Sequence, residues 1–280
     1  MELRGRVVLV TGASSGIGKA TALAFAQAGA AVVAVARREA LLREVSEACR
    51  RFAPGSEHRA GDLGERAFAE RVVDDTVARH GRLDVLVNNA AMPLRKLVYR
   101  ISVEEAETAL RTNFLSCLWT TWAAIPAMLR QGEGAIVNVS SFASKVVPTH
   151  EALYVAGKCA MNGLSEGLWN DLHGSGIHVA LVHPGPIDTE IWAKGEHRSG
   201  YRGRRHPPAL VADALLDAVR RRRHELTVPR RSPPLLAARW LRLLWPAALR
   251  AGVRRMDPVP AEELAAARER ARRGLRLGEA

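Results

Sequence analysis

Six short runs of apolar, largely β-branched residues recur along the chain, alternating with longer stretches of helical periodicity. The runs are apolar throughout rather than at every second position, which is typical of strands in a parallel sheet covered by helices on both faces. The runs are residues 6–10, 31–36, 83–87, 135–139, 178–182 and 225–228, and the helical stretches are 17–28, 39–52, 65–80, 103–130, 152–173 and 209–223. This alternation predicts an α/β fold with a doubly wound parallel sheet, whose ligands bind at the carboxyl ends of the strands.

The length and composition fit one large domain followed by a segment of different character. The 280 residues are 48% hydrophobic and 25% charged, which excludes a disordered or fibrous chain. A Pro- and Arg-rich stretch, Arg230–Pro234, marks a break, so we expect the sheet domain to cover residues 1–230 and an extension to cover 231–280. We find no signal peptide pattern and no run of about 18 uncharged apolar residues that would predict a spanning helix.

The positive charge is concentrated in the last third of the chain. The formal net charge is +12, and residues 195–280 hold 20 basic and 9 acidic groups. On a helical wheel of residues 235–255, the arginines lie within about 120° of arc and the large apolar residues mostly opposite, with an interruption at Pro246. The arginines are Arg239, Arg242, Arg250 and Arg254, and the apolar residues are Trp240, Leu241, Leu244, Trp245 and Leu249.

This basic amphipathic extension has two interpretations. It packs on its own domain or on a partner subunit, or it lies on an anionic membrane surface. Nucleic acid is not an expected partner, because no recognised reading motif accompanies the arginines. The three cysteines, Cys49, Cys117 and Cys159, lack metal or redox spacing and are interpreted as reduced packing residues. We therefore expect a cytoplasmic protein, with peripheral membrane contact as the alternative.

A glycine-rich loop joins the first predicted strand to the first predicted helix. Its sequence is Thr11-Gly12-Ala13-Ser14-Ser15-Gly16-Ile17-Gly18. Glycines in this pattern let the backbone turn sharply and approach a pyrophosphate, and the following helix aims its N–H groups at the phosphates. The position between a first strand and a first helix predicts a dinucleotide-binding loop.

The residues after the second predicted strand bear on the choice of dinucleotide. The strand leads directly into Arg37-Arg38, with no carboxylate to accept a hydrogen bond from a ribose 2′-hydroxyl. A guanidinium at this position pairs with a 2′-phosphate instead. The sequence therefore favours NADP(H) over NAD(H), with Arg37 the first candidate for the phosphate contact and Arg38 the second.

Several further motifs follow in a fixed order. They are Asp62-Leu63, Asn88-Asn89-Ala90, Asn113, Ser141, Tyr154, Lys158 and Pro184-Gly185. Over about residues 5–230 the sequence resembles the short-chain dehydrogenase/reductase family, because the order of these motifs and their spacing agree together. The resemblance implies a single Rossmann-type sheet, with Asp62-Leu63 after a third strand. It also implies hydride transfer between a nicotinamide and a secondary alcohol or ketone. The family usually has glycine where this chain has Ala91.

The resemblance implies a catalytic tetrad, and physical reasoning supports the roles of its members. Tyr154 would be the general acid/base, and Lys158, one helical turn later, would lower the pKa of the phenol and donate to the nicotinamide ribose. Ser141 would orient the substrate oxygen, and Asn113 would hold a water that passes protons to Lys158.

The resemblance also implies the cofactor contacts. Asp62 would accept from the adenine amino group, and Asn88 would brace the loops near the adenosine. The full set of expected contacts is Gly12, Ser14, Ser15, Gly16, Ile17, Gly18, Arg37, Arg38, Asp62, Leu63, Asn89, Ala90, Ala91, Tyr154, Lys158, Pro184, Gly185, Ile187 and Thr189.

The substrate is less constrained by the sequence than the cofactor. Residues 142–153 and 190–206 are expected to select it, and Phe142, Val146, Val147 and Trp192 suggest an apolar carbonyl or alcohol substrate. Residues 194–201, polar and glycine-punctuated, resemble a mobile lid, in which His197, like the nearby His206, is expected to face solvent rather than act in catalysis. The alternatives are a 3-oxoacyl thioester on an acidic carrier, and a membrane-surface protein whose dehydrogenase domain is incidental.

The resemblance finally implies a homodimer or homotetramer. Family members usually associate through two long central helices, here about residues 103–130 and 152–173. On the first of these, Trp119 and Trp122 would serve either such an interface or core packing.

Overall fold

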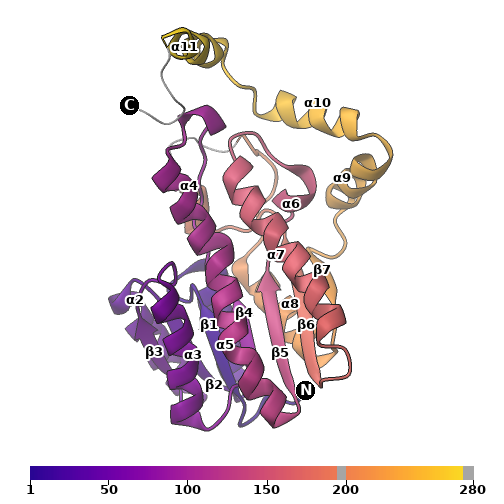
Figure 1. Ribbon diagram of the computed structural model, residues 1–280. Coiled ribbons are helices and arrows are strands. Elements are labelled where there is room, and N and C mark those ends of the chain that lie inside the picture. The colour runs from indigo at the N-terminus through magenta and orange to yellow at the C-terminus, as the bar shows by residue number, and fades with distance from the viewer. Residues whose placement is uncertain (194–199, 274–280) are drawn as a thin grey trace.

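Seven parallel strands form one sheet at the centre of the molecule. The computed structural model describes residues 1–193 and 200–273 (Figure 1). The strands are β1 (Val7–Thr11), β2 (Ala31–Ala36), β3 (Glu57–Ala60), β4 (Val85–Asn88), β5 (Gly134–Val139), β6 (Ile177–Pro184) and β7 (Glu225–Val228). Their order is β3-β2-β1-β4-β5-β6-β7, so the chain winds outward from β1, returns to pair β4 beside β1, and winds outward again. The reversal between β1 and β4 is where such sheets open a crevice for ligands.

The burial of the strands explains which of them the sequence pattern revealed. Every residue of β1, β4, β5 and β6 is buried, as the uninterrupted apolar runs predicted. β3 was not among the six predicted runs, because it is an edge strand that carries Glu57, His58 and Arg59. Charged side chains are common on edge strands, where they discourage pairing with another chain.

Helices cover both faces of the sheet. One face is packed by α1 (Gly16–Gln27), α2 (Glu39–Arg50) and α8 (Pro208–Arg220), and the other by α3 (Arg66–His80), α5 (Ser116–Gln131) and α7 (Ala152–Asp171). The helix predicted over 103–130 is observed as α4 (Val103–Leu110) and α5, joined by a π-helical turn, Arg111–Leu115. The short helix α6 (Ala143–Val146) and the 3₁₀ turns Val98–Arg100 and Glu190–Ala193 were not predicted.

In the described part of the chain, three helices follow the last strand. They are α9 (Pro233–Leu244), α10 (Pro246–Met256) and α11 (Ala261–Arg272), and the break predicted at Pro246 separates the first two. Figure 1 shows α9 beside α6, α10 above it and α11 above α4 in this view, all beyond the carboxyl ends of the strands. Among the described helices, none is both long enough and apolar enough to cross a membrane.

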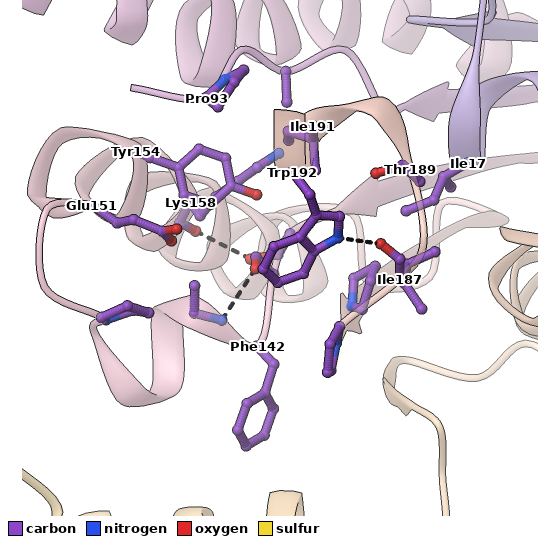
Figure 2. A pocket seen from close by; sticks show the side chains of 18 of the residues that line it. Ile17, Pro93, Phe142, Glu151, Tyr154, Lys158, Ile187, Thr189, Ile191 and Trp192 are labelled. Atoms are coloured by element: carbon purple, nitrogen blue, oxygen red, sulfur yellow. Dashed lines mark hydrogen bonds between the residues drawn. The ribbon is translucent and has the colours of Figure 1, made fainter. Parts of the chain in front are cut away.

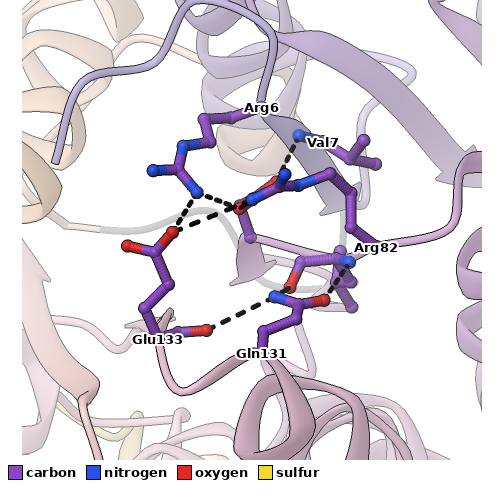
Figure 3. Close-up of polar contacts among 7 residues, drawn as sticks. Arg6, Val7, Arg82, Gln131 and Glu133 are labelled. Atoms are coloured by element: carbon purple, nitrogen blue, oxygen red, sulfur yellow. Dashed lines mark hydrogen bonds and ion pairs between the residues drawn. The ribbon is translucent and has the colours of Figure 1, made fainter.

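At the opposite, amino end of the sheet, a polar network links β1 to the segments before β4 and β5 (Figure 3). Asp84, which is fully buried, accepts hydrogen bonds from the Val7 N–H (2.8 Å), from Arg6 (2.8 Å) and from Arg82 (2.7 Å). Arg6 also pairs with Glu133, which precedes β5. Burial alone would raise the pKa of Asp84, but these hydrogen bonds outweigh it and hold the pKa below its usual value.

Candidate functional site

The loops at the carboxyl ends of the strands surround a cavity of about 740 Å³. Its walls come from the β1–α1 loop, from the segments after β2, β4, β5 and β6, and from α9 and α10. The cavity therefore lies where the winding of the sheet predicts a ligand site.

The glycine-rich loop forms one end of the cavity. Gly12 and Gly16 have φ of +66° and +54°, a left-handed conformation that favours glycine, and a Cβ on Gly18 would collide with the carbonyl oxygen of Gly12. Ser15 precedes α1 and makes no side-chain hydrogen bond to its first amides, so those N–H groups remain directed at the cavity. Asn89 holds the loop in place by donating to the carbonyl of Thr11 at 2.9 Å. This cradle fits a dinucleotide pyrophosphate.

Two guanidinium groups stand beside this loop, as the sequence suggested. Arg38 donates to the hydroxyls of Ser15 (2.6 Å) and Ser14 (3.2 Å) and pairs with Glu190 at 3.0 Å. Arg37 is two-thirds exposed, with its Nη1 at 3.8 Å from the Asp62 carboxylate. Both side chains line the cavity, and Arg37 is the less constrained of the two.

Ser141, Tyr154 and Lys158 all line the cavity. Figure 2 shows Tyr154 and Lys158 next to each other. Ser141 follows β5, and the other two lie one turn apart on α7. The Lys158 ammonium is buried, donates to the carbonyl of Val139 at 2.8 Å and lies 6.0 Å from the centre of the Tyr154 ring. A hydroxyl, a phenol and an ammonium thus share one site.

Burial dominates the protonation of this group. Desolvation raises the pKa of Tyr154 to about 12, against the opposing effect of a hydrogen bond with Ser141. Desolvation also lowers the pKa of Lys158 to about 8. Desolvation is thus the largest influence on the pKa of Tyr154, and the expected effect of Lys158 on the phenol stays a prediction. Tyr154 is a neutral phenol at neutral pH and so is poised to donate a proton.

Asn113 packs against α7 beside Gly157. It lies in the π-helical turn, is fully buried, and is not among the cavity-lining residues. Its amide oxygen accepts from the Met92 N–H at 2.8 Å, and its amide nitrogen donates to the Met92 carbonyl at 3.0 Å. These two hydrogen bonds let Asn113 fix the segment after β4, and its expected role in holding a water near Lys158 stays a prediction.

The remaining predicted cofactor residues line the cavity. They are Asp62, Leu63, Asn89, Ala90, Ala91, Pro184, Gly185, Ile187 and Thr189. Asp62 also accepts from the Gly64 N–H at 2.8 Å. Ala91 is exposed, so its Cβ meets no obstacle. The role expected of Asn88 is wrong. Its side-chain amide lies in the core, where it bonds Thr120, Thr121 and Asn138 instead of bracing the nucleotide loops.

The apolar part of the cavity only partly matches the prediction. Phe142, Val146 and Trp192 line it, whereas Val147 is about half exposed and is not one of the lining residues. Figure 2 shows Trp192 between the Tyr154–Lys158 pair and Thr189 in this view. The predicted lid lies largely outside the described residues, which exclude 194–199 and so His197.

Sequence reasoning missed one whole wall of the cavity. Leu235, Ala238 and Leu241 of α9, with Leu249 and Val253 of α10, close it from the C-terminal side. The three α9 positions recur every third residue, which was the available signal for a buried helix face. The helical wheel of the full 235–255 segment hid this signal by treating two helices as one.

Sequence reasoning also missed a buried ion pair in the wall near Tyr154. Arg95 binds Glu151 at 2.8 Å, with both side chains nearly inaccessible to solvent. Arg95 also donates to the Ile191 carbonyl at 3.2 Å and lies over the Trp192 ring, 5.1 Å from its centre. The pair thus fixes Trp192 and the segment around it.

Comparison with known proteins agrees with this geometry. Residues 6–199 match the sequence model of the short chain dehydrogenase family. The chain is 38% identical over 201 residues to "11-beta-hydroxysteroid dehydrogenase 1A" of Arabidopsis thaliana, a match covering 71% of this chain and 57% of the plant protein. It is 37% identical over 196 residues to a 3-oxoacyl-(acyl-carrier-protein) reductase of Thermotoga maritima, covering 69% and 79%.

Solved structures agree as well. A short-chain dehydrogenase from Sphingobium yanoikuyae in complex with NADPH superposes with a TM-score of 0.75 at 29% identity, covering 91% of this chain and 97% of that one. One from Burkholderia phymatum in complex with NAD superposes with a TM-score of 0.79 at 23% identity, covering 87% and 94%, and shows the shared fold. From the matched family sequence and the sheet with its glycine cradle, we conclude that the chain belongs to the short-chain dehydrogenase family of oxidoreductases.

Proposed function

We propose that this protein is an NADP(H)-dependent oxidoreductase that interconverts an apolar secondary alcohol and the corresponding ketone. The observation that carries the proposal is one cavity that holds Ser141, Tyr154 and Lys158 between a dinucleotide cradle and an apolar wall. Such a cavity accommodates a nicotinamide and an apolar carbonyl compound side by side.

The chain's own residues would position the carbonyl and supply the proton. When bound, the nicotinamide supplies or accepts the hydride. The Ser141 hydroxyl donates to the carbonyl oxygen and orients it, and the neutral Tyr154 phenol gives its proton to that oxygen as the alcohol forms. Lys158, with a pKa lowered to about 8, keeps a positive charge near the phenolate that remains.

The preference for NADP(H) rests on Arg37 and Arg38. Both guanidinium groups line the cavity beside the glycine loop, where a 2′-phosphate would add two negative charges. The Sphingobium yanoikuyae relative was solved with NADPH and the Burkholderia phymatum relative with NAD, so both dinucleotides occur among proteins of this fold.

Replacing Tyr154 with Phe tests the proposed chemistry. We expect Tyr154→Phe to lower turnover of apolar ketones by at least about 100-fold, because the variant retains the ring but cannot donate a proton. NADPH affinity, measured by the fluorescence of the bound nicotinamide, should change little. A variant with full activity would refute the role of Tyr154.

A carrier-bound 3-oxoacyl thioester is the second candidate substrate. It is favoured by the similarity to the Thermotoga maritima reductase and by the net positive charge of the C-terminal third. An acidic carrier docked on arginines would give activity that falls steeply with ionic strength, whereas activity on a neutral ketone would not. Salt titration with both substrate types distinguishes the two.

A further inference from the structure

The outward side of α9 and the start of α10 exposes large apolar side chains. Leu236, Trp240 and Leu243 follow one another at spacings of four and three residues, which places them on one face of α9. Leu244 and Trp245 continue this surface at the junction with α10. Trp240, Leu243 and Trp245 are 60%, 71% and 65% exposed. We call these five residues the outer apolar surface.

The fold of the domain itself does not account for this surface. Leu235, Ala238 and Leu241, on the other side of α9, already close the catalytic cavity. Arg242 fastens the helix to the domain by donating to the carbonyls of Ser144 (2.9 Å) and Lys145 (2.7 Å). α9 is thus held in place by one side and presents a second apolar side to the exterior, an arrangement that marks an interaction site.

Charge identifies the kind of partner. Residues 226–256 contain seven arginines and no acidic residue. Arg230 pairs with Asp217 and Arg242 binds α6, which leaves five exposed arginines to which the structure gives no ion pair with a described residue. These five are Arg231, Arg239, Arg250, Arg254 and Arg255. Such a surface suits an anionic partner with an apolar layer, and a second copy of the same surface would be repelled by it.

We propose that the outer apolar surface docks on an anionic lipid bilayer. Trp240 and Trp245 would lie at the level of the headgroups, where indole rings are favoured, with Leu243 and Leu244 reaching the start of the acyl chains. The flanking arginines would meet lipid phosphates. α9 and α10 would then rest in the plane of the membrane surface, with the domain held above them.

Docking in this way places the catalytic cavity next to a source of apolar substrate. The helices that would touch lipid with their outer sides are the same helices that line the cavity with Leu235, Leu241 and Leu249. A substrate dissolved in the bilayer would enter the cavity past α9 and α10 without crossing water. This step rests on the proposed function, whereas membrane docking itself does not.

Vesicle sedimentation of the full-length protein tests the docking. We expect the protein to sediment with phosphatidylcholine vesicles that contain phosphatidylserine, and to be released when salt is raised, because screening weakens the arginine contacts. The double variant Trp240→Ser/Trp245→Ser should bind at least about tenfold less, since two interfacial anchors are removed. Phe52→Ser is the control, because Phe52 is also about half exposed but follows α2, and its binding should equal that of the wild type.

The readouts separate this proposal from the proposed function. NADPH binding, measured on the same samples, shows that each variant is folded, and sedimentation requires no turnover. Absence of sedimentation of the wild type, or equal sedimentation of the double variant, would overturn membrane docking. Membrane docking would also be overturned if ultracentrifugation showed that the same two tryptophans mediate self-association instead. Binding of the protein to nucleic acid in place of vesicles would overturn it as well.

Discussion

At the scale of single residues, Arg37 and Arg38 differ in how strongly the protein holds them. Arg38 is fixed by Ser14, Ser15 and Glu190, so its hydrogen-bonding capacity is largely used within the protein. Among the described residues, Arg37 has one long contact, with Asp62 at 3.8 Å, so its guanidinium can turn towards a phosphate. Arg37 is therefore the better placed of the two to select for a 2′-phosphate.

This difference predicts the effect of removing each guanidinium. Arg37→Ala should weaken NADPH binding about 10- to 100-fold, the usual value of a charge-assisted contact, and leave NADH binding nearly unchanged. Arg38→Ala should weaken both dinucleotides, because it also releases the Ser14 and Ser15 hydroxyls. Fluorescence titration with both nucleotides measures this, and an unchanged NADPH preference in Arg37→Ala would show that another group reads the phosphate.

Residue types and spacing predicted the positions of the glycine loop, Tyr154 and Lys158, because these features depend on local chain geometry. They could not predict the environment of Asn113, whose side chain bonds a backbone segment 21 residues earlier. Nor could they predict that burial would raise the pKa of Tyr154 despite the nearby Lys158, since desolvation depends on the packing of the whole cavity.

At the scale of secondary structure elements, the Arg242 side chain joins α9 to α6 by hydrogen bonds. Arg242 occupies the free carbonyls at the end of α6, the short helix that follows Ser141. A cation at the C-terminal end of a helix stabilises it and satisfies carbonyls that have no partner within the helix. Arg242 therefore couples the C-terminal wall of the cavity to the segment that positions the substrate.

Loss of this coupling should affect the substrate more than the cofactor. We expect Arg242→Ala to raise KM for an apolar ketone about three- to tenfold, with little change in NADPH affinity, because α9 loses its anchor to α6. Arg239→Ala is the matched control, since it removes an exposed arginine from the same helix without a bond to α6. Steady-state kinetics of the two variants checks this, and equal KM values would contradict a positioning role for Arg242.

The periodicity of the sequence predicted the elements that bury one continuous apolar face. β3 was not predicted from periodicity, because an edge strand needs little apolar surface. α9 and α10 were predicted as a single amphipathic stretch with arginines on one side and apolar residues on the other. The chain turns at Trp245 and Pro246, so the two helices have different axes, and apolar residues of α9 face both the cavity and the exterior.

At the scale of the whole molecule, the network around Asp84 joins the first strand to the loops before β4 and β5. We expect Asp84→Asn to lower the free energy of unfolding by about 3 kcal/mol at neutral pH, because it removes the charge that two arginines share. Glu133→Gln is the control, with an expected loss below about 1 kcal/mol, since the Glu133 side chain is 42% exposed and its ion pairs are screened by solvent. Chemical denaturation of both variants measures the difference.

The same network gives a pH dependence with a defined sign. The pKa of Asp84 is lower in the folded protein than its ordinary value of 3.8. Its contribution to stability is therefore complete above about pH 4 and is lost as the pH falls through the lower folded pKa. The gap between wild type and Asp84→Asn should narrow below pH 4, and a constant gap would contradict this assignment.

The assembly expected from family resemblance also belongs to this scale. Trp119 is buried in the core, whereas Trp122 is 54% exposed on α5, so only the second is available for an interface. We propose a homodimer or homotetramer through α5 and α7. Sedimentation velocity should show species larger than 30.5 kDa, with Trp122→Asp shifting the distribution towards the monomer. A wild-type protein that sediments as a monomer would refute the assembly.

The cavity draws its walls from segments that lie far apart in the chain. The glycine loop, Arg37 and Arg38 lie before residue 92, the catalytic candidates lie mid-chain, and the wall formed by α9 and α10 comes after Val228, once the sheet is complete. Exchange of the gene segment that encodes the residues after Val228 would thus alter this wall of the substrate site. The glycine loop, Tyr154 and Lys158 would stay unchanged. Substrate range in such a protein can therefore diverge by recombination at one junction.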